Sequence, residues 1–272
     1  MPGTELQERD QECRPLLRWA GSKRQFLPEL VRQSPKSFAA YVEPFAGSAS
    51  LFFALTPREA VLGDVNTELM NFYVQLRASP SELHAAASTY SQEAADYSKY
   101  RQRFNSPCDP LEKAALFWYL NRTCFNGLYR TNQAGEFNVP IGRKLSLFPS
   151  LQQVWECAEV MSTAHLVCGD FAETIDLADR GDFLYIDPPY HRVSNRDRGE
   201  YGPDAMKDDE LGRLIESTQI AATRGAKILF SYNVDLSSEL RGWRKHLVRG
   251  RYVIGANAND RKMISEYIFC NY

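Results

Sequence analysis

The sequence lacks the paired cysteines that mark zinc knuckles and dithiol sites. Six cysteines are scattered through its 272 residues, and no two stand at the two-residue spacing that such sites require. The sequence contains no long apolar run. An apolar leader is also absent, since the first dozen residues are polar and acidic. We therefore expect reduced thiols, no metal site, no membrane contact and a cytoplasmic location.

An excess of positive charge is missing too, because the formal net charge is -2. Such a balance excludes attraction of phosphates by the total field of the protein. Residues 241–262 depart from it, with seven basic side chains against a single acid, Asp260. This segment predicts a basic patch, and a solvated surface hairpin is the alternative interpretation. The basic residues are Arg241, Arg244, Lys245, Arg249, Arg251, Arg261 and Lys262.

Four short apolar segments each run to a carboxylate, as buried parallel strands do where they open into a binding loop. They are residues 39–45, 60–64, 166–170 and 183–187, and the acids are Glu43, Asp64, Asp170 and Asp187. Residues 227–232 read as another strand, and 252–254 with 264–270 as a hairpin. The sequence thus predicts an α/β fold with a doubly wound, mostly parallel sheet and a C-terminal β-hairpin. In such a sheet, ligands sit beyond the carboxyl ends of the strands.

The block of residues 80–150 interrupts this alternation, because it has helical spacing and no buried-strand signal. Within it, residues 111–120 predict an amphipathic helix, and residues 121–144 a loop or short hairpin. The length of 272 residues suits one large domain with an insertion. We expect a sheet domain of residues 14–79 and 151–272, and a second domain of residues 80–150.

The segment Asp187-Pro188-Pro189-Tyr190 directly follows an apolar strand. Two prolines cannot continue a strand ladder, so they fix a rigid loop at the strand end. The Asp187 carboxylate and the Pro188 carbonyl can each accept a hydrogen bond from an exocyclic amine of a nucleobase, which draws its lone pair out of conjugation. Tyr190 can stack on a base flipped out of the duplex. A plain strand-to-loop turn is the alternative interpretation.

Other strand ends suit a nucleotide-like cofactor. Gly47, after Glu43, lets the backbone approach a ligand closely, and Asp64 is placed to accept from a ribose. Asp170 can hold an adenine amine or cap a helix at the surface. Phe45 can offer a π face to a sulfonium cation, or pack as a core aromatic.

Near the N-terminus, residues 15–23 place Trp19 and Lys23 around a glycine turn. Lys23 can supply the counter-charge for a carboxylate of a bound ligand. Taken alone, the segment reads as a helix N-terminus.

Together these segments closely resemble the Dam-like (D12, alpha-class) DNA adenine-N6 methyltransferases, from about Leu16 to the C-terminus. The order of the segments matches as well as their content. The matching residues are 17–23 (LRWAGSK), 42–47 (VEPFAG), 63–66 (GDVN), 120–122 (LNR) with 125–128 (FNGL), 135–140 (GEFNVP) with 142–143 (GR), and 187–190 (DPPY).

The resemblance implies a Rossmann-like methyltransferase that moves a methyl group from S-adenosylmethionine to adenine N6 in double-stranded DNA, by base flipping and direct attack of the amine. It implies cofactor contacts from Trp19, Lys23, Asp64 and Asp187, with catalysis by residues 187–190. The cell would be bacterial or phage-infected, with the enzyme at the nucleoid, as a monomer or homodimer. Ala49 stands where the family often has a second glycine.

By the same resemblance, the insertion is a target-recognition domain that reads DNA. Arg130 matches a base-reading position, and an arginine can contact guanine O6 and N7 with two hydrogen bonds. Asn126 followed by Gly127 also reads as a simple turn. The expected DNA contacts are Arg122, Phe125, Asn126, Leu128, Arg130, Asn138, Pro140 and Arg143.

Two alternatives to this function remain at the level of the sequence. Methylation of cytosine N4 or of RNA uses the same amine chemistry, although an aspartate at position 187 favours adenine. A catalytically idle DNA-binding regulator that keeps the sheet is the other alternative. Residues 191–209 are charged and loop-like, and we expect them to move over the flipped base.

Overall fold

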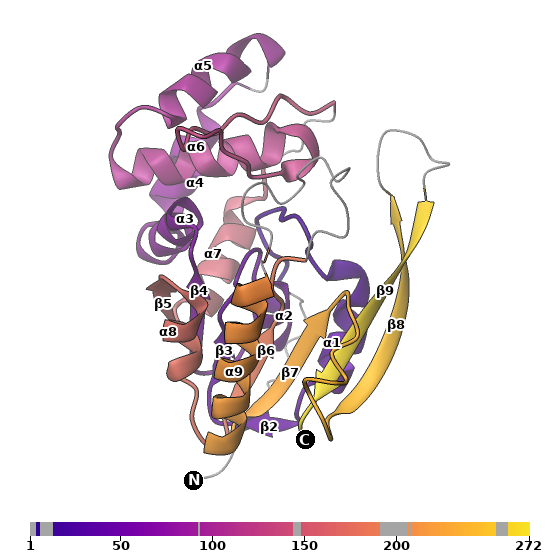
Figure 1. The fold of residues 1–272 in the computed structure, drawn as a ribbon. Coiled ribbons are helices and arrows are strands. Elements are labelled where there is room, and N and C mark those ends of the chain that lie inside the picture. The colour runs from indigo at the N-terminus through magenta and orange to yellow at the C-terminus, as the bar shows by residue number, and fades with distance from the viewer. Residues whose placement is uncertain are drawn as a thin grey trace.

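The computed structural model describes residues 4–5, 13–91, 93–143, 148–190, 206, 208–253 and 261–272. A seven-stranded sheet forms its centre, in the order β5-β4-β3-β6-β7-β9-β8 (Figure 1). The strands are β3 (Tyr41–Glu43), β4 (Ala60–Asp64), β5 (Ala164–Cys168), β6 (Phe183–Ile186), β7 (Lys227–Tyr232), β8 (Arg244–Val253) and β9 (Arg261–Cys270). A separate short pair joins β1 (Thr4–Glu5) to β2 (Ser37–Phe38).

Five of the seven strands are parallel, which confirms the α/β prediction. Strand β3 pairs in parallel with β4 and β6, β4 with β5, and β6 with β7. Strand β9 runs antiparallel to β7, and β8 antiparallel to β9, so the C-terminal hairpin extends the sheet at one edge. The hairpin is longer than expected, because β8 begins at Arg244 rather than near Tyr252. The first residues of β8 are charged, so the apolar pattern of the sequence does not indicate this part of the strand.

The central strands β3, β6 and β7 are buried on both faces, and successive residues of β6 belong to different cores. On β6, Phe183 and Tyr185 pack into one cluster, whereas Leu184 and Ile186 pack into the other. This follows from the two-residue period of a strand, and explains why the central strands read as continuous apolar runs.

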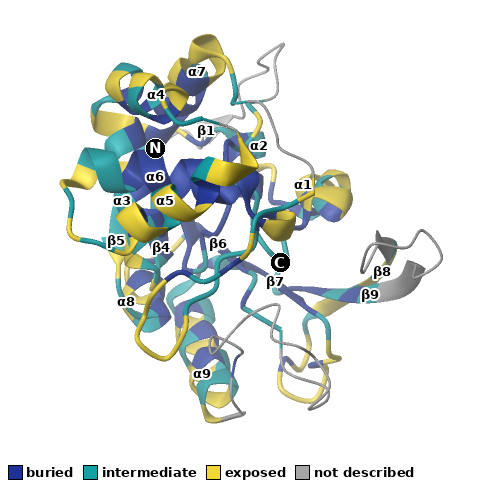
Figure 2. Cartoon of the chain, turned by 90° about the horizontal axis from the view of Figure 1, so that it is seen from above, coloured by how far each residue is buried: buried dark blue, intermediate teal, exposed yellow. Residues whose placement is uncertain are grey.

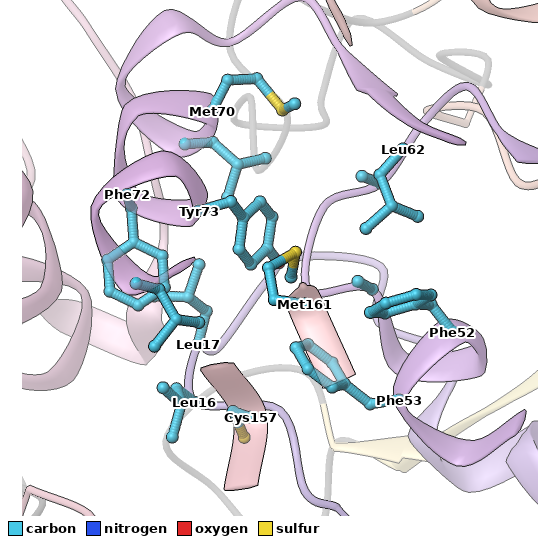
Figure 3. Packing of buried hydrophobic residues seen from close by; sticks show 14 of the residues in the cluster. Leu16, Leu17, Phe52, Phe53, Leu62, Met70, Phe72, Tyr73, Cys157 and Met161 are labelled. Atoms are coloured by element: carbon cyan, nitrogen blue, oxygen red, sulfur yellow. The ribbon is translucent and has the colours of Figure 1, made fainter. Parts of the chain in front are cut away.

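Helices cover the two faces. The smaller cluster packs against α8 (Phe171–Asp176) and α9 (Asp208–Arg224). The larger one contains α2 (Ser50–Leu55), α3 (Thr67–Ala78) and α7 (Leu151–Met161), whose aromatic and sulfur-bearing side chains meet in Figure 3. Helix α1 (Leu27–Gln33), preceded by η1 (Arg24–Phe26), packs beside α2. The layers thus hold the carboxyl ends of the parallel strands at one edge.

The block of residues 80–150 contains α4 (Pro80–Ser88), α5 (Ala94–Phe104), α6 (Pro110–Thr123) and η2 (Phe125–Gly127). The expectation of an amphipathic helix at 111–120 is wrong in one respect: every residue from Ala114 to Asn121 is buried, so this stretch of α6 has no side open to solvent (Figure 2). It is surrounded by α3, α4 and α5. Because α6 also joins the larger core, the division into two domains stays a prediction.

Helix starts follow local capping rules. The Asn66 side chain accepts from two backbone amides of α3, Asp109 does the same for α6, and Ser150 forms a capping box with Gln153. Among the helices of the described residues, none is long and apolar enough to cross a membrane.

Candidate active site at the carboxyl edge of the sheet

A cavity of about 380 Å³ opens beyond the carboxyl ends of the parallel strands. Its walls carry all the residues predicted for cofactor binding, and all four of the predicted catalytic loop. They are Trp19, Lys23, Glu43, Phe45, Gly47, Asp64, Asp170, Asp187, Pro188, Pro189 and Tyr190. Sequence segments more than a hundred residues apart therefore meet here, because parallel strands end at one edge.

The turn after β3 is locked to the end of β4 by Asp64. Gly47 donates its backbone N–H to Asp64 Oδ2 at 3.0 Å, and Asn66 donates to Oδ1 at 2.9 Å. Gly47 has φ +46°, and a Cβ there would stand 2.7 Å from Cδ1 of Trp19. Glycine is needed both for the left-handed backbone and for the close approach of the indole.

Ala49, where the family often has a second glycine, also adopts a left-handed conformation, with φ 51°. Its N–H donates to the Ala46 carbonyl at 2.6 Å, and the residue is fully buried. The turn therefore keeps the shape that a glycine would give it, at the cost of strain of about 1–2 kcal/mol for an L-residue.

Trp19 forms a wall of the cavity together with a residue that the sequence did not reveal. Its ring stacks on Tyr129, with centroids 6.2 Å apart and planes 17° apart, and both rings line the cavity. Tyr129 directly precedes Arg130 in the insertion. The stack therefore joins the insertion to the cavity.

The Asp187 carboxylate is held by Lys23, whose ammonium donates to Oδ1, and by a hydrogen bond from Tyr185. Lys23 is only 5% exposed. Burial raises the pKa of Asp187 to about 6; the Lys23 ammonium opposes the rise and the Glu266 carboxylate adds to it. The pKa of this carboxyl therefore lies closer to neutral pH than that of an exposed aspartate.

Glu266 on β9 is a second carboxylate that no motif indicated. It is fully buried and accepts from the Tyr190 hydroxyl at 2.7 Å and from the Ser231 hydroxyl at 2.5 Å. Lys23 Nζ lies 3.5 Å from it. The one available signal was a glutamate inside the otherwise largely apolar strand β9.

Glu43 is buried and accepts a hydrogen bond from Tyr41 at 2.9 Å. Burial raises its pKa well above the usual range, and the charges of Asp187 and Asp64 add to this effect. The Glu43 carboxyl therefore takes up a proton more readily than an exposed glutamate does.

Asp170 and Phe45 meet at another side of the cavity. The Asp170 carboxylate caps α8 and forms two hydrogen bonds with Arg213, at 3.1 and 2.7 Å. Burial alone would raise its pKa, but the bonds from Arg213 and Ala172 lower it. Phe45 is half-buried and packs on Phe171 at 5.5 Å. Asp170 thus has the capping role that the sequence left open, and still faces the cavity.

The predicted DNA contacts fall into two groups. Phe125, Asn126, Pro140 and Arg143 are exposed, and the Phe125 amide donates to the Pro140 carbonyl at 2.9 Å, which brings the two segments together. Asn126 has φ 55°, so the Asn-Gly pair does form a tight turn. These side chains share one loop cluster on the insertion.

The remaining predicted contacts are partly buried. Arg130 donates from Nε to the Asn138 side chain at 2.8 Å, and Leu128 is half-buried. Arg122 donates to the Leu16 carbonyl at 3.3 Å, and burial, with Arg18 and Arg24 nearby, lowers its pKa to about 10. Arg122 therefore braces the N-terminal segment.

The basic segment near the C-terminus lies on and before β8. Arg241, Arg244, Lys245 and Arg249 are exposed, and Lys245 pairs with Asp235 at 2.9 Å. The side chains of Arg251, Arg261 and Lys262 lie outside the described residues, as do the turn at 256–259 and nearly all of the expected lid at 191–209. In the part of the chain that is described, no group of three or more His, Cys, Asp or Glu residues is arranged to hold a metal ion.

Comparisons with known proteins agree with this geometry. The family described as "D12 class N6 adenine-specific DNA methyltransferase" matches residues 19–256. The type II methyltransferase M1.LlaDCHI of Lactococcus lactis subsp. cremoris is 31% identical over 279 residues, which cover 98% of each chain.

Two further relatives are adenine methylases by name. The DNA adenine methylase of Escherichia coli K12 is 32% identical over 265 residues, 94% of each chain. The DNA N-6-adenine-methyltransferase of Escherichia phage P1 is 36% identical over 223 residues, which cover 80% of this chain and 29% of the phage protein.

Proposed function

The chain belongs to the D12 class of N6 adenine-specific DNA methyltransferases, and on that premise we propose that its cavity binds S-adenosylmethionine while Asp187-Pro188-Pro189-Tyr190 presents adenine N6 for methylation. Membership gives the reaction class, the methylation of adenine in DNA by a donor of the S-adenosylmethionine type. It also decides between adenine and the cytosine or RNA alternatives. The donor itself, the double-stranded substrate and the roles of single residues are our proposal.

One observation carries this proposal: Trp19, Lys23, Asp64 and Asp187 line one cavity although they come from three separate segments. The cavity fits the donor, which has a nucleoside, a sulfonium and an amino-acid end. Aromatic walls suit an adenine ring and a cation, and several carboxylates face a ligand with two positive groups. Gly47 keeps the floor clear of a Cβ.

Each residue has a role that its position supports. Asp64 is the expected acceptor for ribose hydroxyls, and Lys23 the counter-charge for the carboxylate end of the donor. Bound S-adenosylmethionine supplies a methyl carbon on a cationic sulfur, which leaves as a neutral thioether. Asp187 and the Pro188 carbonyl accept hydrogen bonds from the adenine amine and direct its lone pair toward that carbon. With a pKa raised to about 6, ionised Asp187 can also take the proton that the amine loses.

The loop cluster of Phe125, Asn126, Pro140 and Arg143 is the proposed contact to the duplex, with Arg130 as the base reader and Arg122 and Leu128 supporting the loop. Tyr190, which lines the same cavity, is the proposed stacking partner of a flipped adenine. The Tyr129–Trp19 stack supports coupling between target recognition and the donor pocket. We further propose action on cellular DNA in a bacterial or phage-infected cytoplasm, as a monomer or homodimer.

The experiment is to express the chain in a bacterial host that lacks adenine methylation. Total DNA is hydrolysed and analysed by mass spectrometry, and the modified positions are mapped by sequencing. We expect N6-methyladenine at one defined sequence. Methylcytosine alone, methylation of RNA only, or tight DNA binding with no methylation would each contradict the proposal.

A further inference from the structure

Glu266 lies behind the wall of the cavity, on the hairpin strand β9, and makes contact with two residues of the site. It comes 76 residues after Tyr190 in the sequence, yet its Oε2 accepts the Tyr190 hydroxyl. Its Oε1 accepts the Ser231 hydroxyl and lies 3.5 Å from Lys23 Nζ. A glutamate with no exposed surface is costly unless its charge is matched, so these contacts define its role.

Both oxygens of Glu266 accept hydrogen bonds. Two hydroxyls donate at 2.7 and 2.5 Å, and an ammonium lies close by. A carboxylate accepts at both oxygens, whereas an amide or a carboxylic acid must place a proton toward one of them. The buried charge is therefore matched by Lys23, which is itself 5% exposed.

Lys23 is shared between two carboxylates. It donates to Asp187 Oδ1 and lies near Glu266, and its ammonium stands 4.6 Å from the centre of the Tyr190 ring. Asp187 Oδ1 accepts from the ammonium, so an amine that arrives at Asp187 competes with Lys23 for this carboxylate. A second carboxylate gives the ammonium another partner when the amine arrives.

We propose that Glu266 is a positioning residue for methyl transfer: it fixes the Tyr190 ring through the phenol hydroxyl, and it gives Lys23 a second carboxylate so that Asp187 can accept from the amine. This inference rests on the proposed function of residues 187–190. Glu266 touches neither donor nor base, and acts only through Lys23 and Tyr190. The C-terminal hairpin thereby becomes part of the catalytic apparatus.

Glu266→Gln is the test, because it keeps the shape and removes the charge. We expect kcat to fall about 10- to 100-fold, as for a small misplacement of reacting groups. Because Lys23, the proposed counter-charge of the donor, loses a competing carboxylate, the Kd for S-adenosylmethionine measured by calorimetry should not rise. The groups around Asp187 are Lys23, Glu266, Tyr185 and Glu43. Loss of the Glu266 charge should move the acid limb of kcat/KM to lower pH by about one unit.

Tyr190→Phe removes the hydroxyl that donates to Glu266 and keeps the aromatic ring. We expect kcat to fall in this variant as well. The kcat of the double variant should be at most about twofold below that of Glu266→Gln, since the effects of coupled residues are not additive. Losses that multiply would overturn the proposal. Should Glu266→Gln fail to fold, unchanged kcat in Tyr190→Phe would overturn it as well.

Asp182→Asn is the matched control, a second buried carboxylate that loses its charge. Asp182 accepts from the Ala40 and Asp179 amides, at 3.0 and 2.8 Å, at the opposite end of β6 from the cavity. It should lower thermal stability and leave kcat and the pH profile unchanged.

If Glu266→Gln behaves as Asp182→Asn does, Glu266 is structural and the proposal is wrong. The wild type is assayed in parallel: inactive wild type defeats the proposed function, whereas active wild type with an equally active Glu266→Gln defeats this inference alone.

Discussion

Replacing Gly47 by alanine should damage the donor pocket through one methyl group. The residue has φ +46°, and the new Cβ would lie 2.7 Å from Trp19 Cδ1 and 3.0 Å from its Nε1. Trp19 cannot simply retreat, because its other side stacks on Tyr129 and its ring also packs near Phe117. The indole must therefore move across the cavity that it lines.

The expected loss of unfolding free energy has two parts. The left-handed backbone costs an alanine about 1–2 kcal/mol, and forcing a methyl group into a packed wall costs about 1–3 kcal/mol more. Gly181→Ala isolates the first part, because Gly181 has φ +87° and nothing within 4 Å of its Cβ position. Gly47→Ala should thus lose about 2–5 kcal/mol of unfolding free energy, against about 1–2 kcal/mol for Gly181→Ala.

Two assays separate the parts: urea denaturation for stability, and calorimetric titration with S-adenosylmethionine for donor affinity. We expect Gly47→Ala to bind the donor at least about tenfold more weakly, which is near 1.4 kcal/mol, and Gly181→Ala to bind it normally. Equal stability losses in the two variants, together with unchanged donor affinity, would refute the account of the Trp19 wall.

Three further predictions concern the acids and the recognition loop. Because burial raises the pKa of Asp187 to about 6, kcat/KM should fall about tenfold for each pH unit below 6, as the carboxylate gains a proton. The contribution of Asp187 to the free energy of unfolding should rise as the pH falls through this range, because the folded protein binds the proton more tightly than the unfolded chain. A flat activity profile between pH 5 and 7 would contradict this. Asp170→Asn keeps a capping side chain and loses an exposed ion pair with Arg213, so the free energy of unfolding should change by less than about 1 kcal/mol. Donor affinity, measured by calorimetry, should fall about tenfold, and an unchanged affinity would exclude a cofactor contact. Arg130→Ala should weaken discrimination at one base pair by about 1–3 kcal/mol in methylation rates on singly substituted sites, whereas equal losses on all DNA would indicate a phosphate contact.

The strand ends were predictable because their physics is local. A short apolar run that stops at an acid predicts a buried parallel strand, and parallel strands bring their carboxyl ends to one edge. Glu43, Asp64 and Asp187 meet there for that reason. The Asp187 loop was likewise readable, since two prolines must end the strand.

Other features depend on tertiary contacts, which the order of apolar and polar residues along the sequence does not predict. Residues 114–121 of α6 are buried on all sides, and α3, α4 and α5 are the helices in contact with it. The neighbours of this stretch cannot be predicted from its own sequence. The hydrogen bond from Arg122 to the Leu16 carbonyl forms only because α6 packs beside the N-terminal segment, and the prediction that Arg122 contacts DNA stays a prediction. Glu266 meets Lys23 and Tyr190 only after the hairpin has added β9 to the sheet.

The most direct test of the central claim is methyl transfer by Asp187→Ala. The variant removes the proposed acceptor and leaves Glu266 as a partner for Lys23, at 3.5 Å. With labelled S-adenosylmethionine and DNA that carries the target sequence, we predict a rate at least about 10²-fold below wild type, and DNA affinity close to wild type because phosphate contacts supply most of it. Near-normal turnover by the folded variant would contradict the assignment of residues 187–190.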